Sequence, residues 1–140
     1  ANDIFALLCL TLFLKLLVTT SLQAFARKQA GAYAHAEDAA YWNGRKDDPP
    51  LAQQAQLALR NDGENIPIFL ALAWAFVASG GSPRALAAYG AVFFVARSVH
   101  TFAFVRPRQP LRNRAYVIGL GATFALAVHL TIAVFTQALV

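Results

Sequence analysis

The stretch Leu59-Arg60-Asn61-Asp62-Gly63-Glu64-Asn65-Ile66-Pro67 places one cation, two acids and two amides in front of the apolar run 68–78. Charged side chains beside a membrane-length apolar segment are costly, so they usually have a partner or a function. In a helix, Arg60 and Glu64 lie four residues apart and Asn61 and Glu64 three apart, so the three side chains share one face. The stretch therefore predicts a helix that carries a guanidinium, an amide and a carboxylate into a membrane.

The composition of the chain indicates a membrane protein. Of its 140 residues, 58% are hydrophobic and only 14% are charged, which is too apolar for an ordinary soluble domain of this length. The apolar residues form long blocks, and a membrane-spanning helix needs about 20 of them. We therefore predict a single all-α domain, 1–140, that forms an integral membrane four-helix bundle with spans at about 3–27, 51–79, 83–105 and 114–139.

The net charge of +5 could suggest a nucleic-acid partner, but the positions of the cations indicate membrane topology instead. The second connection carries only Arg84, and most cations fall in the first and third connections. In a four-span chain these two connections lie on one side, which the positive-inside rule makes cytoplasmic. We expect both ends of the chain on the opposite side and no bound nucleic acid. The cations in question are Arg27, Lys28, Arg45, Lys46, Arg106, Arg108, Arg112 and Arg114.

Lys15 lies near the middle of the first predicted span, too deep to reach the interface easily. We predict that it pairs with an acid of the second span, either Asp62 or Glu64. Such a pair could fix the packing of the helices or take part in catalysis, and the sequence leaves both roles open.

Three further positions carry local predictions. Pro67 cannot donate the helical bond to residue 63, so it should kink the second span. Residues 37–40 should start a short interfacial helix, because acidic residues there precede two alanines. His129, in the middle of the last span, is predicted to be a packing residue.

Polar residues of three helices are predicted to lie at one depth. Arg60 and Arg97 are ten and nine residues from the ends of their spans, or about 15 Å along a helix. One polar layer in the cytoplasmic leaflet would then contain Arg60, Asn61, Glu64, Arg97, His100, Arg112 and Tyr116. Arginines bind carboxylates bidentately and a glutamate accepts an ammonium, so this layer suits a zwitterion with more carboxylates than amines. A single cysteine and scattered histidines provide no metal-ligand set, so no metal is predicted.

Three motifs resemble those of the MAPEG family, the membrane-associated proteins in eicosanoid and glutathione metabolism. They are Arg60-Asn61-Asp62-x-Glu64-Asn65-Ile66-Pro67, Arg97-Ser98-Val99-His100-Thr101 and Pro110-Leu111-Arg112. The pattern is most similar to that of the family's prostaglandin E synthases and glutathione transferases. The resemblance implies a homotrimer of four-helix subunits in the lipid bilayer, with glutathione as the cofactor, bound between neighbouring subunits near the cytoplasmic side.

The resemblance also implies roles for individual residues. Arg112 would be the catalytic arginine that stabilises the glutathione thiolate, and the Asn113 amide could donate one hydrogen bond to it. Glu64 would accept the ammonium of glutathione and Arg60 would bind a carboxylate. Asn61, His100 and Tyr116 would complete the glutathione site, and Arg97 joins this set as a member of the same polar layer.

Three positions depart from the prostaglandin synthase pattern. Phe104 replaces a tyrosine, and Phe25 and Leu57 each replace an arginine that contacts the ligand. These departures argue against a prostaglandin isomerase more strongly than against glutathione binding.

The resemblance favours a glutathione-dependent membrane transferase or peroxidase that acts on lipophilic electrophiles or lipid peroxides, with a role in detoxification. The alternatives are a prostaglandin E synthase-like isomerase of eicosanoid metabolism, a non-catalytic protein that binds and presents lipids, and a small channel or transporter. The high alanine content and the preference for arginine over lysine suggest a bacterial inner membrane. A eukaryotic source would place the chain in the endoplasmic reticulum.

Overall fold

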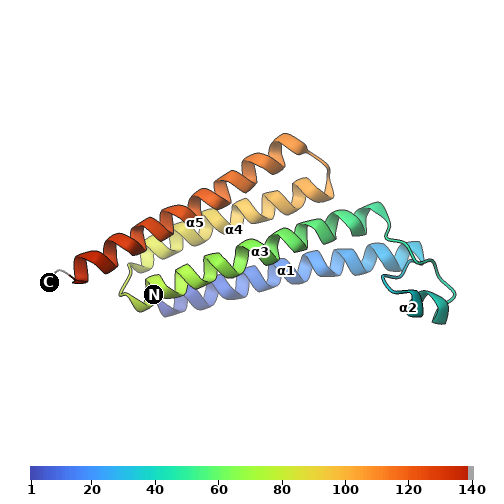
Figure 1. Cartoon of the computed structure of the whole chain (residues 1–140), viewed down its shortest axis with the longest axis horizontal. Coiled ribbons are helices and arrows are strands. Elements are labelled where there is room, and N and C mark those ends of the chain that lie inside the picture. Colours follow the sequence, from blue (N-terminus) through green and yellow to red (C-terminus); the bar gives the residue numbers. More distant parts are fainter. Residues whose placement is uncertain (139–140) are drawn as a thin grey trace.

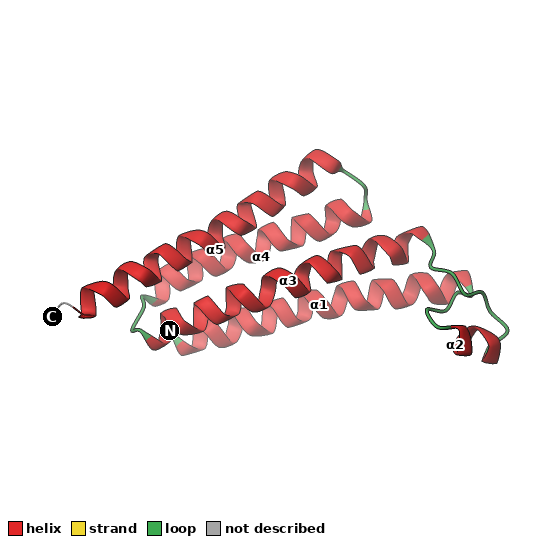
Figure 2. Ribbon diagram, viewed as in Figure 1, coloured by secondary structure: helices red, strands yellow, loops and turns green. Residues whose placement is uncertain are grey.

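A computed structural model describes residues 1–138 of the chain. These residues form helices and connections without any strand, so the predicted all-α class is confirmed (Figure 2). The predicted end of the last span, residue 139, lies outside the described residues. The helices are α1 (Asn2–Ala30), α2 (Ala36–Tyr41), α3 (Pro50–Ala78), α4 (Pro83–Val105) and α5 (Gln109–Ala138).

The starts of the helices follow the positions of the prolines. Pro50 and Pro83 occupy the first helical positions of α3 and α4, where the missing N–H donor costs nothing. Pro110 likewise falls in the first turn of α5, which therefore begins at Gln109, five residues before the predicted start of the span at residue 114. The short helix predicted around residues 37–40 is confirmed as α2. α3 continues through Pro67, and the predicted kink there stays a prediction.

The four long helices pack as two antiparallel pairs, α1 with α3 and α4 with α5 (Figure 1). α3 and α4 join the two pairs, whereas the described parts of α1 and α5 do not contact each other. In Figure 1 the pairs lie close together at the end that carries both termini and diverge toward the other end. The α1–α3 and α4–α5 connections are both at this second end.

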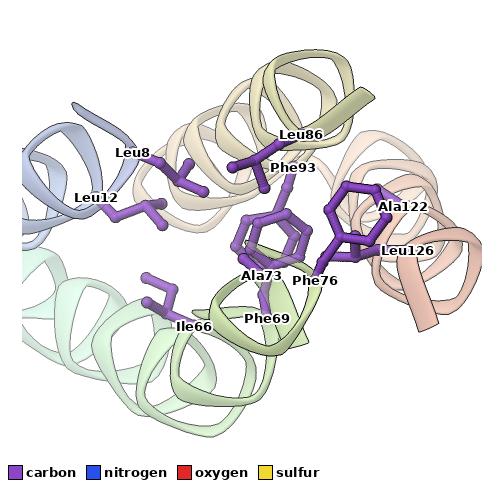
Figure 3. Close-up of a cluster of buried hydrophobic side chains, with 10 residues drawn as sticks. All are labelled: Leu8, Leu12, Ile66, Phe69, Ala73, Phe76, Leu86, Phe93, Ala122 and Leu126. Atoms are coloured by element: carbon purple, nitrogen blue, oxygen red, sulfur yellow. The ribbon is translucent and has the colours of Figure 1, made fainter. Parts of the chain in front are cut away.

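The hydrophobic core lies between the two helix pairs and contains side chains from all four long helices (Figure 3). The rings of Phe69 and Phe93 stack at its centre with their centroids 3.9 Å apart. Burying an aromatic side chain of this kind contributes about 1.5–3 kcal/mol. The packing role predicted for His129 is confirmed: its Nδ1 lies 3.3 Å from the Tyr89 hydroxyl, and its ring meets the ring of Phe76 edge to face.

Three of the described helices are long and apolar enough to cross a membrane: Asn2–Ala30, Pro83–Val105 and the segment Gln109–Thr136 of α5. α3 is as long as α1, but it is not among them because the polar cluster 60–65 interrupts its apolar run. The chain is therefore an all-helical protein with three helices capable of spanning a membrane.

Candidate functional site

A buried ion cluster connects three helices beneath the candidate site. Asp62 of α3 accepts hydrogen bonds from Lys15 of α1 at Oδ2 and from Arg97 of α4 at Oδ1. The Arg97 Nε and Nη2 atoms lie 2.9 and 2.7 Å from that Oδ1. The three side chains are at most 7% exposed. Of the two acids predicted to pair with Lys15, the structure selects Asp62.

The cluster contains two cations, Lys15 and Arg97, and one carboxylate. A hydroxyl group gives the lysine ammonium a second hydrogen-bond acceptor. The Lys15 Nζ also donates to the Thr101 Oγ1 at 2.6 Å. Buried charges are tolerated only when they are paired and hydrogen-bonded. The cluster therefore fixes the relative positions of α1, α3 and α4.

Arg97 extends this cluster to Asn61 on the adjoining turn of α3. Its Nη2 donates to the Asn61 Oδ1 at 2.5 Å. A guanidinium has only donors, so the amide oxygen of Asn61 must face Arg97. The Nδ2 group of Asn61 is therefore turned away from Arg97.

Asn61 lines a polar pocket of about 430 Å³ between α3 and the α4–α5 pair. Five residues predicted for the glutathione site meet in this pocket, from three different helices. Gln109 also lines it, and no sequence signal had pointed to that residue. The lining residues are Leu57, Asn61, His100, Phe104, Gln109, Arg112, Asn113 and Tyr116.

Phe104 is the centre of the ring contacts in the pocket. The Arg112 guanidinium carbon lies 4.7 Å from the centroid of the Phe104 ring, a cation–π contact. His100 meets the same phenyl ring edge to face at 4.9 Å and lies 6.1 Å from the Tyr116 ring. These contacts hold the half-buried Arg112 side chain inside the pocket without a carboxylate partner among the described residues.

His100 has an unused polar atom at this place. Its side chain is buried, and its Nδ1 has no hydrogen-bond partner among the described residues. A buried polar atom without a partner costs about 1–3 kcal/mol. His100 also lines the polar pocket, so this unpaired atom belongs to a side chain of the candidate site.

The remaining predicted site residues lie outside this pocket. Arg97 is in the ion cluster, 1% exposed, and does not line the pocket. Arg60 and Glu64 form an i,i+4 pair on the outer face of α3, with an Nε–Oε1 distance of 3.6 Å and side chains 80% and 62% exposed. The polar layer predicted from depth is thus divided among a pocket, a core cluster and an outer face.

The sequence was compared with family models and with known proteins. The sequence model of the MAPEG family matches residues 5–132. Prostaglandin E synthase of Bos taurus is 33% identical over 117 residues, which cover 80% of this chain and 76% of that protein. Microsomal glutathione S-transferase 1 of Homo sapiens is 30% identical over 125 residues, covering 83% and 79%. With nearly its whole length matched in this way, the chain belongs to the MAPEG family.

Proposed function

We propose that this protein is a membrane-bound glutathione transferase or peroxidase that acts on lipophilic electrophiles or lipid peroxides. The observation that carries the proposal is the polar pocket, in which the Arg112 guanidinium lies among other donors and without a carboxylate. Relatives named glutathione S-transferase and prostaglandin E synthase support the same reading.

The donors of the pocket fit the chemistry of glutathione. Glutathione has two carboxylates, one ammonium and one thiol, and the pocket offers Arg112, the Asn61 amide, the Asn113 amide and the Tyr116 hydroxyl. The His100 imidazole also lines the pocket. The lining residues include no acid. The ammonium would therefore need Glu64, on the neighbouring outer face of α3.

That outer face supports an assembly of several copies, for which the family resemblance implies a homotrimer. Arg60 and Glu64 are exposed on a helix that would otherwise face lipid, and exposed charges in hydrocarbon are strongly unfavourable. A neighbouring copy would cover the face, with α3 as the fourth membrane span. Arg60, Glu64 and the polar pocket would then belong to one site at a subunit interface. By the positive-inside rule, that site lies toward the cytoplasmic side.

Arg112 is assigned the catalytic role. Glutathione supplies a thiol, and a cation beside a thiol lowers its pKa and favours the nucleophilic thiolate. Arg112 would provide this cation and Asn113 a hydrogen bond to the sulfur. The adjoining bilayer would concentrate apolar substrates near the pocket.

An isomerase is the second candidate, since prostaglandin E synthases are among the relatives that match most of the chain. The phenyl ring of Phe104 argues against it, because this ring occupies the pocket wall with no hydroxyl to bind a ligand. A transferase requires no tyrosine hydroxyl at this position, since Arg112 and Asn113 are the groups proposed to act on the thiol.

Glutathione binding to the detergent-purified protein tests the proposal, with thiolate absorbance recorded on mixing. Arg112→Ala should abolish the thiolate signal and lower turnover about 100-fold or more, while much of the affinity remains. Glu64→Ala should weaken binding about tenfold or more, because the ammonium loses its counter-charge.

Arg84→Ala is the control, since Arg84 is likewise an arginine in the first turn of a long helix, but it is exposed and lies at the end of α4 far from His100 and Phe104 of the pocket. It should leave both signals unchanged. If the wild-type protein binds no glutathione, the enzymatic proposal fails. Equal, small effects of Arg112→Ala and Glu64→Ala would show that the site has been assigned to the wrong residues.

A further inference from the structure

Negative charge is distributed very unevenly along this chain. Glu64 is its last acidic residue, and the sequence that follows contains six arginines and no aspartate or glutamate. The α1–α3 connection has acids of its own: Asp48 pairs with Arg27, and Asp47 pairs with Arg45. The α4–α5 connection, at the same end of the molecule (Figure 1), has none. Uncompensated positive charge is therefore concentrated where α4 meets α5.

Three arginines at this place are available to an external anion. Arg106, Arg108 and Arg114 are exposed and form no ion pair within residues 1–138. Arg112 is directed to the polar pocket, where it contacts Phe104. Two residues along a helix correspond to a rotation of about 200°, so Arg114 lies on the other side of α5 from Arg112.

Arg114 borders an apolar groove on that other side. The groove lies between α4 and α5 and encloses about 500 Å³. Small side chains, Ala96 and Ala115, lie among the lining residues, together with Val95 and Ile118, which are 57% and 54% exposed. Among the described residues that line the groove, Arg114 is the only charged one. The α4 side runs from residue 91 to residue 99, or about 12 Å along the helix.

We propose that this groove binds an acyl chain of an anionic phospholipid, with the phosphate of the headgroup held by Arg114. The long stem of an arginine can lie along an apolar groove while its guanidinium reaches the headgroup region. Guanidinium groups bind phosphate bidentately, and basic clusters at the cytoplasmic ends of spans attract anionic lipids. Arg106 and Arg108, in the adjoining connection, add to the attraction. This site lies apart from the polar pocket and does not depend on glutathione.

Lipid retention tests the proposal. The protein is reconstituted into nanodiscs containing equal amounts of phosphatidylglycerol and phosphatidylcholine, and native mass spectrometry counts the lipids that stay bound. The wild-type protein should retain phosphatidylglycerol in preference to phosphatidylcholine. Arg114→Gln should reduce the retained phosphatidylglycerol about fivefold, as expected for one cation near an anionic headgroup. Arg84→Gln, which removes an exposed arginine at the other end of α4, should have no effect.

A second variant separates the acyl-chain contact from the charge. Val95→Trp fills the groove and leaves every arginine in place, so it too should reduce the retained phosphatidylglycerol, with unchanged helical circular dichroism. Equal retention of the two lipids by the wild-type protein would overturn the proposal. So would equal losses in Arg114→Gln and Arg84→Gln, which would indicate diffuse attraction. A change in oligomer mass in Val95→Trp would show that a second copy, and not a lipid, covers the groove.

Discussion

Asp62 divides its two carboxylate oxygens between α1 and α4, and no other acid of the chain is as deeply buried. Oδ2 accepts from Lys15 and Oδ1 accepts from Arg97. Arg97 in turn orients the amide of Asn61 at the wall of the polar pocket. Packing and the candidate site therefore depend on the same carboxylate.

Replacement of Asp62 should be among the most damaging single changes in the chain. Asp62→Asn leaves Lys15 and Arg97 buried without a counter-charge, which costs about 3–5 kcal/mol when one partner of a buried pair is removed. Thermal unfolding in one detergent would show this as a large fall in Tm. Asp47→Asn is the matched control, because the Asp47 side chain is 53% exposed in its pair with Arg45 and such pairs contribute at most about 1 kcal/mol. Equal falls in Tm would contradict the structural role of the buried cluster.

The spacing of the buried residues in α3 explains why Asp62, and not Glu64, pairs with Lys15. The buried positions recur every three or four residues, as in an amphipathic helix. Asp62 follows in that register and Glu64 does not, so the sequence contained a signal that distinguished the two candidate partners of Lys15. The buried residues of α3 are Ala52, Ala55, Ala58, Asp62, Ile66, Phe69, Ala73 and Phe76.

Depth, in contrast, was not sufficient to predict the site. Counting residues from the helix ends gives the height of a side chain in the membrane but not the direction in which it points. The same count placed Arg97 and Arg60 in one layer, yet Arg97 is buried and Arg60 is exposed. Direction depends on which helices pack together, and the hydrophobic runs of α1, α4 and α5 are too uniform to indicate that.

The connection between α1 and α3 provides a prediction about pH. Asp48 accepts from the Arg27 Nε at 2.5 Å and Nη2 at 2.8 Å, and these hydrogen bonds lower the pKa of Asp48 below its ordinary value of 3.8. A lowered pKa in the folded state stabilises the fold above the ordinary value, and the effect is lost as the pH falls through the lowered pKa.

Asp48→Asn should therefore lower Tm at pH 7 and lower it less at an acidic pH below 3.8, because the ion pair is lost as the carboxyl of the wild-type protein becomes protonated. The contribution at pH 7 should be at most about 1 kcal/mol, because the pair is partly exposed. Glu37→Gln is the control, since Glu37 is exposed and forms no ion pair among the described residues. A loss of Tm in Asp48→Asn that is the same at both pH values would exclude the ion pair as its cause.

At the scale of the whole molecule, the outer face of α3 is charged and exposed, and in our proposal a neighbouring copy covers it. Arg60 and Glu64 lie on this face, and Gly63 between them has nothing within 4 Å of the position that a Cβ would occupy. The family resemblance predicted an assembly, but composition and periodicity in one sequence carry no information on contacts between copies. The open space at Gly63 makes the proposed assembly testable.

Gly63→Leu should be harmless to an isolated chain and damaging to an oligomer. The Cβ of a residue placed here has open space around it, and leucine favours the helix by about 1 kcal/mol over glycine, but its side chain would collide with a copy packed against α3. We expect native mass measurements to give three copies for the wild-type protein and a smaller assembly for the variant, together with weaker glutathione binding.

Gly121→Leu is the control, because Gly121 is also a helical glycine with open surroundings. It lies near Ile118 and Phe124, exposed apolar residues of α5 that suit contact with lipid. A variant at Gly63 that keeps the wild-type mass would mean that another partner covers the charged face of α3, and the trimeric site would have to be abandoned.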